Sequence, residues 1–202
     1  MKASTKREAA PRDWPVAAVA AAGLAISAHL AVAKLAGGQA LLCEAGGGCD
    51  IVQLSRYAIF LGLPTAAWGA ALYAVVTALA LVGLAVRRWL AVFALAAAAL
   101  AFSSYLTYLQ LFVVRAICPW CVADAVVAVA LVVTVLLRRP PARRRQTGPG
   151  RLALVGGGAA VATVVFAAGV FVADAPSEHR EYREALARHL SASGAIFYGA
   201  YW

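Results

Sequence analysis

Charged residues are scarce in this chain of 202 residues, which is only 13% Asp, Glu, Lys and Arg and is 63% hydrophobic. Soluble domains carry about 25% charged residues. The composition therefore indicates an integral membrane protein. The sequence also lacks an internal repeat, which argues against a solenoid.

Cysteine is scarce as well. Cys43 and Cys49 are loosely spaced, whereas Cys118 and Cys121 form a tight Cys-x-x-Cys. Four cysteines are too few for a disulfide-dense secreted scaffold, and the His or further Cys residues of a common zinc module are missing. A redox relay is the natural interpretation.

Five apolar stretches are long enough to cross a bilayer, which takes about 20 helical residues. They cover residues 14–36, 59–86, 89–114, 119–137 and 152–172. The first exceeds the apolar core of a signal peptide and should remain attached. We predict an all-α integral membrane fold, a four-helix transmembrane bundle followed by a fifth transmembrane helix and a short extracytoplasmic tail.

The net charge of +9 comes from short basic clusters between the apolar runs, which does not favour a nucleic-acid surface. Twelve of the eighteen Lys and Arg residues fall on one side of the predicted spans and six on the other. By the positive-inside rule the N-terminus is cytoplasmic. All four cysteines and the C-terminal tail then lie outside the cytoplasm, where disulfides persist. We expect a multi-pass protein of the inner or plasma membrane.

The sharpest motif is Cys118-Pro-Trp-Cys121. With Pro119 as the first helical residue, both sulfurs lie at a helix N-terminus, where unpaired amide hydrogens and the helix dipole stabilise a thiolate. The alternatives are a pair of structural cysteines or half of a metal site. The oxidising side and the second cysteine pair favour redox chemistry.

Cys43 and Cys49 bracket a glycine-rich segment that lets the loop move. A mobile pair suits thiol-disulfide exchange, in which one sulfur must approach another, whereas a static structural disulfide is the alternative. Because the second and third spans form a hairpin, Cys49 can meet Cys118. The loop is then a shuttle.

Two further polar residues are predicted inside the membrane. Asp124 lies one turn beyond Cys121 and is a candidate for proton handling at the thiol, the alternative being a solvated group near the interface. His29 is either a proton carrier or, as we favour, a packed side chain hydrogen-bonded to a neighbouring carbonyl.

The order and spacing of these motifs resemble the vitamin K epoxide reductase family, in particular its bacterial members. The resemblance spans residues 14–137 and is carried by Cys43-x5-Cys49-Asp50, Ser55-Arg56-Tyr57-Ala58, Gly62-Leu-Pro64, Trp68-Gly69, Tyr73 and Cys118-x-x-Cys121. It implies a four-helix bundle around a quinone, either menaquinone or ubiquinone, and a thioredoxin-like dithiol protein as partner.

The resemblance also implies roles for individual residues. Cys118 and Cys121 would be the catalytic pair, with Cys121 facing the quinone and Cys118 exchanging with Cys49. Cys43 would take electrons from the partner, and Ser55 would lie near the reaction centre. The expected activity is oxidation of partner dithiols with a quinone as acceptor, which supports disulfide formation outside the cytoplasm.

Two positions depart from the animal members of that family. Thr65 stands where the vertebrate enzyme has a quinone-binding Asn, and Ala125 stands where it has a Tyr. These changes argue for a plain quinone rather than an epoxide as acceptor. Thr65 could contact the quinone or cap a helix. The competing functions are a quinone-linked thiol oxidase of an unrelated four-helix family and a metal-binding or structural membrane protein.

The predicted organisation has five parts. They are a cytoplasmic segment (1–13), the catalytic four-helix domain (14–137), a Pro/Gly-rich basic linker (138–151), the fifth helix (152–173) and an extracytoplasmic tail (174–202). The tail ends in a strand-like aromatic run that resembles the start of a fused thioredoxin-like domain, stopping just before its Cys-x-x-Cys. We expect a truncation, a frameshift or a selenocysteine codon read as a stop; the alternative is a tail that lies on the membrane surface.

Overall fold

The computed structural model describes residues 11–38, 40–41, 43–44, 46–140, 148–173, 185–186 and 188–193. Five helices in this part of the chain are long and apolar enough to cross a membrane. They are α1 (Trp14–Leu35), α3 (Thr65–Val82), α4 (Val86–Tyr108), α5 (Pro119–Leu137) and α6 (Pro149–Ala173). The predicted all-α integral membrane fold is confirmed.

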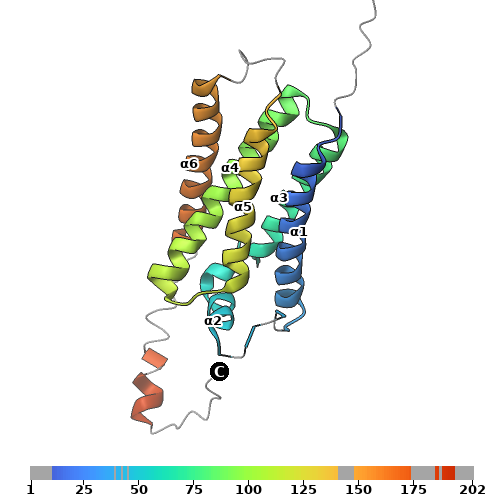
Figure 1. The fold of residues 1–202 in the computed structure, drawn as a ribbon. Helices are drawn as coiled ribbons and strands as arrows, with labels where there is room; N and C mark the ends of the chain where they lie inside the picture. Colours follow the sequence, from blue (N-terminus) through green and yellow to red (C-terminus); the bar gives the residue numbers. More distant parts are fainter. Residues whose placement is uncertain are drawn as a thin grey trace, which may run out of the picture.

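The first four long helices form a bundle, and α6 lies outside it (Figure 1). α1 packs along α3 and also contacts α5, while α4 packs between α5 and α6. α3 and α4 make few contacts with each other although a short turn joins them. This separation leaves space inside the bundle.

The hydrophobic effect does not drive these helices together, because lipid is as apolar as their side chains. Small residues instead allow the helices to pack closely. At Gly23 of α1, a Cβ atom would stand 2.6 Å from the ring of Tyr73 on α3. Tyr73 is 2% exposed. The missing side chain of Gly23 therefore admits a large ring between the two helices.

Polar contacts fix the end of the bundle that lies away from the cysteines. Asp13 caps α1 by accepting a hydrogen bond from the Val16 amide at 3.3 Å, and it forms an ion pair with Arg138 at 3.2 Å. The buried Trp89 donates its indole N–H to the carbonyl oxygen of Val135 at 2.9 Å. These bonds tie the start of α1 and of α4 to the end of α5.

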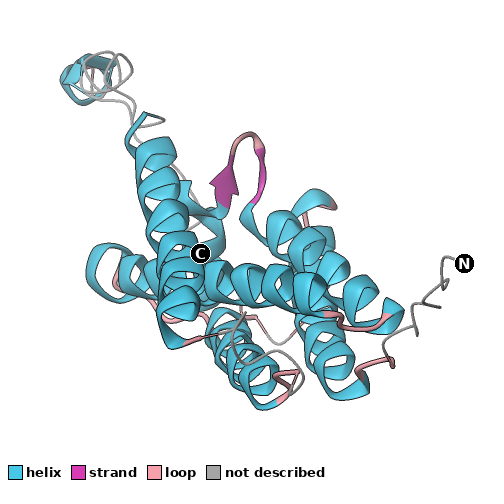
Figure 2. Ribbon diagram, turned by 90° about the horizontal axis from the view of Figure 1, so that it is seen from above, coloured by secondary structure: helices cyan, strands magenta, loops and turns pink. Residues whose placement is uncertain are grey.

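The second span is shorter than predicted. Residues 59–64 form a hairpin of β1 (Ile59–Phe60) and β2 (Leu63–Pro64), seen at the margin of the bundle in Figure 2. The turn residues Leu61 and Gly62 have φ angles of 51° and 78°, the left-handed conformation that two-residue hairpins require. Pro64 precedes the helix instead of lying in its first turns, so the expected start at residue 59 was wrong.

Three short elements complete the cysteine end. The loop after α1 contains the helix α2 (Gly48–Leu54), which is followed by a 3-10 turn, η1 (Arg56–Ala58). The end of the third span is a π-helix, η2 (Leu109–Val114). Single π-helical turns are frequently found at functional sites.

Candidate active site

The buried residue Cys118 is the N-cap of α5, and Pro119 is the first residue of that helix. The chain reaches this point from η2 through Arg115, whose φ angle of 56° reverses the backbone. The Cys118 amide donates a hydrogen bond to the side-chain oxygen of Gln110 at 3.4 Å. The π-helix thus supplies a side chain that fixes the start of α5.

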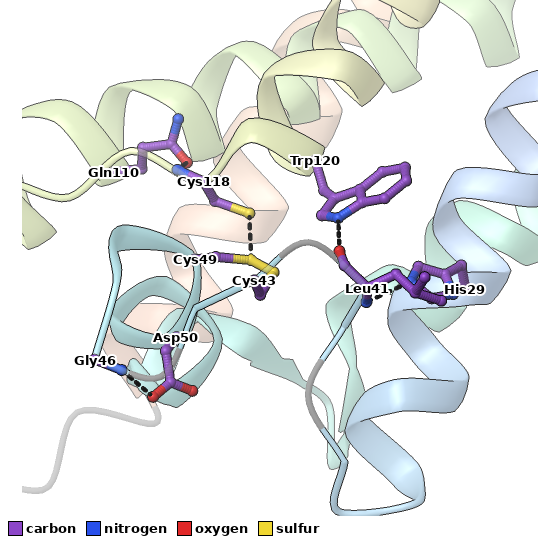
Figure 3. The surroundings of a disulfide bond; sticks show 9 residues. All are labelled: His29, Leu41, Cys43, Gly46, Cys49, Asp50, Gln110, Cys118 and Trp120. Carbon is purple, nitrogen blue, oxygen red and sulfur yellow. Dashed lines mark hydrogen bonds between the residues drawn. A yellow bond between two sulfur atoms is a disulfide. The ribbon is translucent and has the colours of Figure 1, made fainter. Parts of the chain in front are cut away.

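Cys43 and Cys49 form a disulfide, and its Cys49 sulfur lies 3.6 Å from the sulfur of Cys118 (Figure 3). Cys49 occupies the first turn of α2 and is buried. A Cβ atom at Gly48 would overlap the backbone oxygen of Ile117. The glycine therefore lets α2 lie directly on the chain before Cys118, and this contact brings the three sulfurs together.

A second set of contacts anchors the loop that carries Cys43. The indole of Trp120 donates to the carbonyl oxygen of Leu41 at 2.7 Å, and the Leu41 amide donates to Nε2 of His29 at 3.1 Å (Figure 3). The His29 and Trp120 rings lie 5.3 Å apart. His29 thus accepts from an amide, and the expected bond to a carbonyl was wrong.

Cys118 and Cys121 carry free thiols. A hydrogen bond with the Cys121 thiol, aided by the backbone amides of Cys121 and Trp120 and opposed by burial, lowers the pKa of Cys118 to about 7. The direction agrees with the stabilisation of a thiolate at a helix N-terminus. Near neutral pH, much of the reduced Cys118 is therefore thiolate, the form that takes part in disulfide exchange as nucleophile and as leaving group.

Cys121 opens on the other side into a cavity of about 480 Å³, to which α3 and α4 contribute more lining residues than the other helices. Both hydroxyl residues predicted near the reaction centre, Ser55 and Thr65, line this cavity. Their hydroxyls are bonded to backbone oxygens, that of Ser55 to Val52 at 2.7 Å and that of Thr65 to Tyr57 at 2.8 Å. Thr65 does not cap α3, because its hydroxyl donates to another segment.

Asp124 lines the same cavity and is held from two other helices. Its carboxylate accepts hydrogen bonds from the hydroxyls of Ser27 on α1, at 3.2 Å, and Ser103 on α4, at 3.3 Å. The Tyr73 side chain on α3 faces the same carboxyl group. Asp124 is thus a packed group rather than a solvated one, and no sequence motif predicts its hydroxyl partners.

Two buried polar atoms beside this cavity have no hydrogen-bond partner among the described residues. They are the side-chain nitrogen of Gln110 and the hydroxyl of Tyr73. Both side chains line the cavity. An unpartnered buried polar group costs about 1–3 kcal/mol, so each donor is a place where a bound molecule can contribute an acceptor.

Within the part of the chain that the structure describes, no three His, Cys, Asp or Glu residues are grouped to hold a metal ion. The Cys43–Cys49 disulfide lies beside the thiol pair of Cys118 and Cys121, and the thiol pair adjoins a mostly apolar cavity. Such an arrangement can move electrons from the surface of the protein into the cavity by thiol-disulfide exchange.

Comparison with known families identifies the same region. Residues 14–136 match the Vitamin K epoxide reductase family. The match includes the four-helix bundle, the loop with α2 and all four cysteines, and it ends before α6. The chain is therefore a multi-pass membrane oxidoreductase that belongs to the vitamin K epoxide reductase family.

Proposed function

We propose that this protein oxidises a thioredoxin-like dithiol partner outside the cytoplasm and passes the two electrons to a membrane quinone, either menaquinone or ubiquinone. One observation carries the proposal: the Cys49 sulfur lies 3.6 Å from that of Cys118, while Cys121 opens into the cavity. The two cysteine pairs thereby connect the exposed loop with the membrane interior. The product is a disulfide in the partner, so the activity supports disulfide formation.

The first exchange takes place on the loop. A partner thiolate attacks Cys43, which forms a mixed disulfide and releases the Cys49 thiolate; the second partner thiol then releases Cys43 and leaves the partner oxidised. Two electrons now reside on Cys43 and Cys49.

The second exchange moves these electrons inward. The Cys49 thiolate attacks Cys118 in a Cys118–Cys121 disulfide and releases Cys121, and Cys43 then resolves the Cys49–Cys118 bond. The result is a Cys43–Cys49 disulfide beside a reduced Cys118 and Cys121, which is the cysteine pattern that the structure shows.

The cavity fits a quinone. Its volume falls within the range of about 300–1,000 Å³ that is typical of small-molecule sites. The unpartnered side-chain nitrogen of Gln110 can donate a hydrogen bond to a carbonyl oxygen of a quinone, and the Tyr73 hydroxyl lies on the same wall, where it faces Asp124. A quinone bound there accepts two electrons and two protons.

The protein's own groups position the reduced thiols and manage their protons. Cys121 is the sulfur exposed to the cavity, and Cys118 is the one beside the loop. We assign proton handling to Asp124, because it lies one turn beyond Cys121 and on the cavity wall. Ser55 and Thr65 shape the wall between the loop and α3, since their hydroxyls are already donated to the backbone.

Purified protein supplied with a quinone and either a small dithiol or a reduced thioredoxin-like protein tests this function. Replacing Cys118 or Cys121 by Ala should abolish quinone reduction with both donors, because both electrons must leave through this pair. Replacing Cys43 or Cys49 by Ala should remove activity with the protein donor and spare much of it with the small dithiol, which can reach Cys118 directly.

Two outcomes would contradict the proposal. Quinone reduction that survives the loss of Cys118 or Cys121 would remove the catalytic pair from the pathway. Equal losses with both donors in the Cys43 and Cys49 variants would show that the loop is not a shuttle. Thr134→Ala serves as the control, since Thr134 is not part of the cavity wall and its hydroxyl donates to the carbonyl oxygen of Ala130 in its own helix.

A further inference from the structure

Helix α6 lies beyond the residues that match the family, yet it forms part of the cavity wall. Thr163, Phe166 and Ala167 line the cavity together with residues of the four-helix bundle. The sequence predicts α6 only as a fifth transmembrane helix after the four-helix bundle. Because α6 forms part of the cavity wall, it can contact a molecule bound in the cavity.

The contacts of α6 with the bundle are specific. Where α6 meets α4, a Cβ atom at Gly156 would stand 3.0 Å from the ring of Phe93. Nearer the cysteine end, Phe60 of the hairpin lies 5.9 Å from the ring of Phe166 and 5.4 Å from that of Phe171. The helix is thus held at two levels, with Thr163 between them.

The cavity changes in polarity along its length. Its polar side chains gather at Cys121, where Asp124 is bonded to Ser103 of α4. On α4 the cavity continues from Ser103 past Ala99 and Ala98 to Leu95, which is eight residues earlier in the helix. At 1.5 Å per residue this is a distance of about 12 Å along the helix from Ser103 to Leu95.

The part of the cavity wall that α6 forms offers no hydrogen bonds. The hydroxyl of Thr163 on α6 is donated to the carbonyl oxygen of Ala159 at 2.7 Å, so it is not available to a ligand. Phe166 is 58% exposed although it lines the cavity, which leaves a large apolar ring beside the bilayer.

We infer that α6 forms the binding site for the isoprenoid tail of the quinone, with Thr163 and Phe166 in contact with the chain. This inference rests on the proposed function, because it concerns the same acceptor. A long-tailed quinone has a polar ring and an apolar chain, and the cavity has the same order from Cys121 to α6. The fifth helix then selects among acceptors by their tails.

The test compares two quinones with the same ring, one without a tail and one with a tail of several prenyl units. Thr163→Trp fills the apolar part of the cavity, and we expect it to raise the KM for the tailed quinone by about tenfold or more. The tail-less quinone should be reduced with nearly unchanged KM. Phe166→Ala, which removes a ring without adding volume, should also weaken only the tailed acceptor.

The matched control is Val161→Trp. Val161 is on the same helix, is 65% exposed and is not part of the cavity wall, so its substitution adds the same side chain toward lipid. We expect both KM values to stay near those of the unmodified protein.

A second readout does not depend on turnover. A prenyl quinone with a photoreactive group on its tail should label the α6 peptide that contains Thr163 and Phe166, and an excess of unlabelled tailed quinone should prevent the labelling. Labelling confined to other helices would overturn the inference. Equal effects of Thr163→Trp on both acceptors, or the same effect from Val161→Trp, would also overturn it.

The two levels of the proposal fail in different ways. If the unmodified protein reduces neither quinone, the proposed function itself is wrong. If it reduces both but α6 substitutions leave tail selectivity unchanged, only the role of α6 is refuted.

Discussion

At the scale of single residues, Cys118 lies between Cys49, which belongs to the loop, and Cys121, which faces the cavity. It faces the Cys49 sulfur on one side and the Cys121 thiol on the other, and its position as N-cap of α5 exposes it to the amides of that helix. A thiolate here can act only if it forms near working pH, because the thiolate is the nucleophile in disulfide exchange.

The pH dependence of Cys118 alkylation measures this property. The pKa is lowered to about 7, so the thiol form prevails below that pH and the thiolate above it. In protein that has the Cys43–Cys49 disulfide and reduced Cys118 and Cys121, the rate of Cys118 modification by iodoacetamide, followed by peptide mass spectrometry, should rise through about pH 7 and level off above it. An ordinary cysteine rises near pH 8.5.

The matched variant is Cys121→Ala. The hydrogen bond with the Cys121 thiol is the largest cause of the lowered pKa, so its removal should shift the midpoint upward toward the ordinary value. An unchanged midpoint in this variant, or an ordinary midpoint in the unmodified protein, would show that the pair does not activate Cys118.

At the scale of elements, the short helix α2 decides whether the two cysteine pairs meet. Its first residue, Gly48, lies against the backbone of Ile117 with no room for a side chain. A methyl group there would push α2 away from the chain before Cys118. Misplacement by about 1 Å can slow a reaction about a hundredfold.

Gly48→Ala should therefore slow electron transfer from the loop to Cys118 by about ten- to a hundredfold, measured as quinone reduction with a protein donor. Reduction with a small dithiol should be spared. Alanine favours helix more than glycine does, so a loss cannot be attributed to melting of α2. Gly38→Ala is the control, because the nearest atom to its Cβ is the Ala33 oxygen at 3.9 Å; equal losses in both variants would contradict the docking role of α2.

The elements also show how far the sequence could be interpreted. Long apolar runs predicted the five spans, since length and hydropathy act over a whole helix. The same measure could not locate the start of α3, because residues 59–63 are themselves apolar and only the Gly62-Leu-Pro64 sequence marks the turn. The π-helix η2 likewise has no distinct composition.

The sequence likewise predicts some features of the candidate site and not others. The cysteines follow from their motif, and their approach follows from the hairpin of spans between them. The hydroxyl partners of Asp124 come from α1 and α4, and α6 contributes wall residues from the far end of the chain. These contacts depend on how helices pack, which no local sequence pattern encodes. Most of the predicted tail resembling a thioredoxin-like domain lies outside the described residues, and its aromatic end lies wholly outside them.

At the scale of the whole molecule, the structure separates two chemical environments. The disulfide, Cys118 and the loop between α1 and α3 lie at one end of the bundle, as Figure 1 shows for α2. The start of α1, the turn between α3 and α4 and the end of α5 lie at the other, where Asp13 pairs with Arg138. Among the described residues, the arginines at this second end outnumber the basic residues at the first; they are Arg12, Arg87, Arg88, Arg138, Arg139 and Arg151, against Lys34, Arg56 and Arg115.

The positive-inside rule predicts that this basic end is cytoplasmic, and two exposed positions at opposite ends allow a direct test. In a protein without its four cysteines, Glu44→Cys lies in the loop at the cysteine end, and Ala85→Cys lies in the turn before α4. A membrane-impermeant maleimide should label Glu44→Cys in intact cells and should label Ala85→Cys only after permeabilisation. The two ends of the bundle must face opposite sides of the membrane, so the opposite labelling pattern would invert the topology. It would then place the Cys43–Cys49 disulfide in the reducing cytoplasm, where the proposed oxidation of partner dithiols has no use.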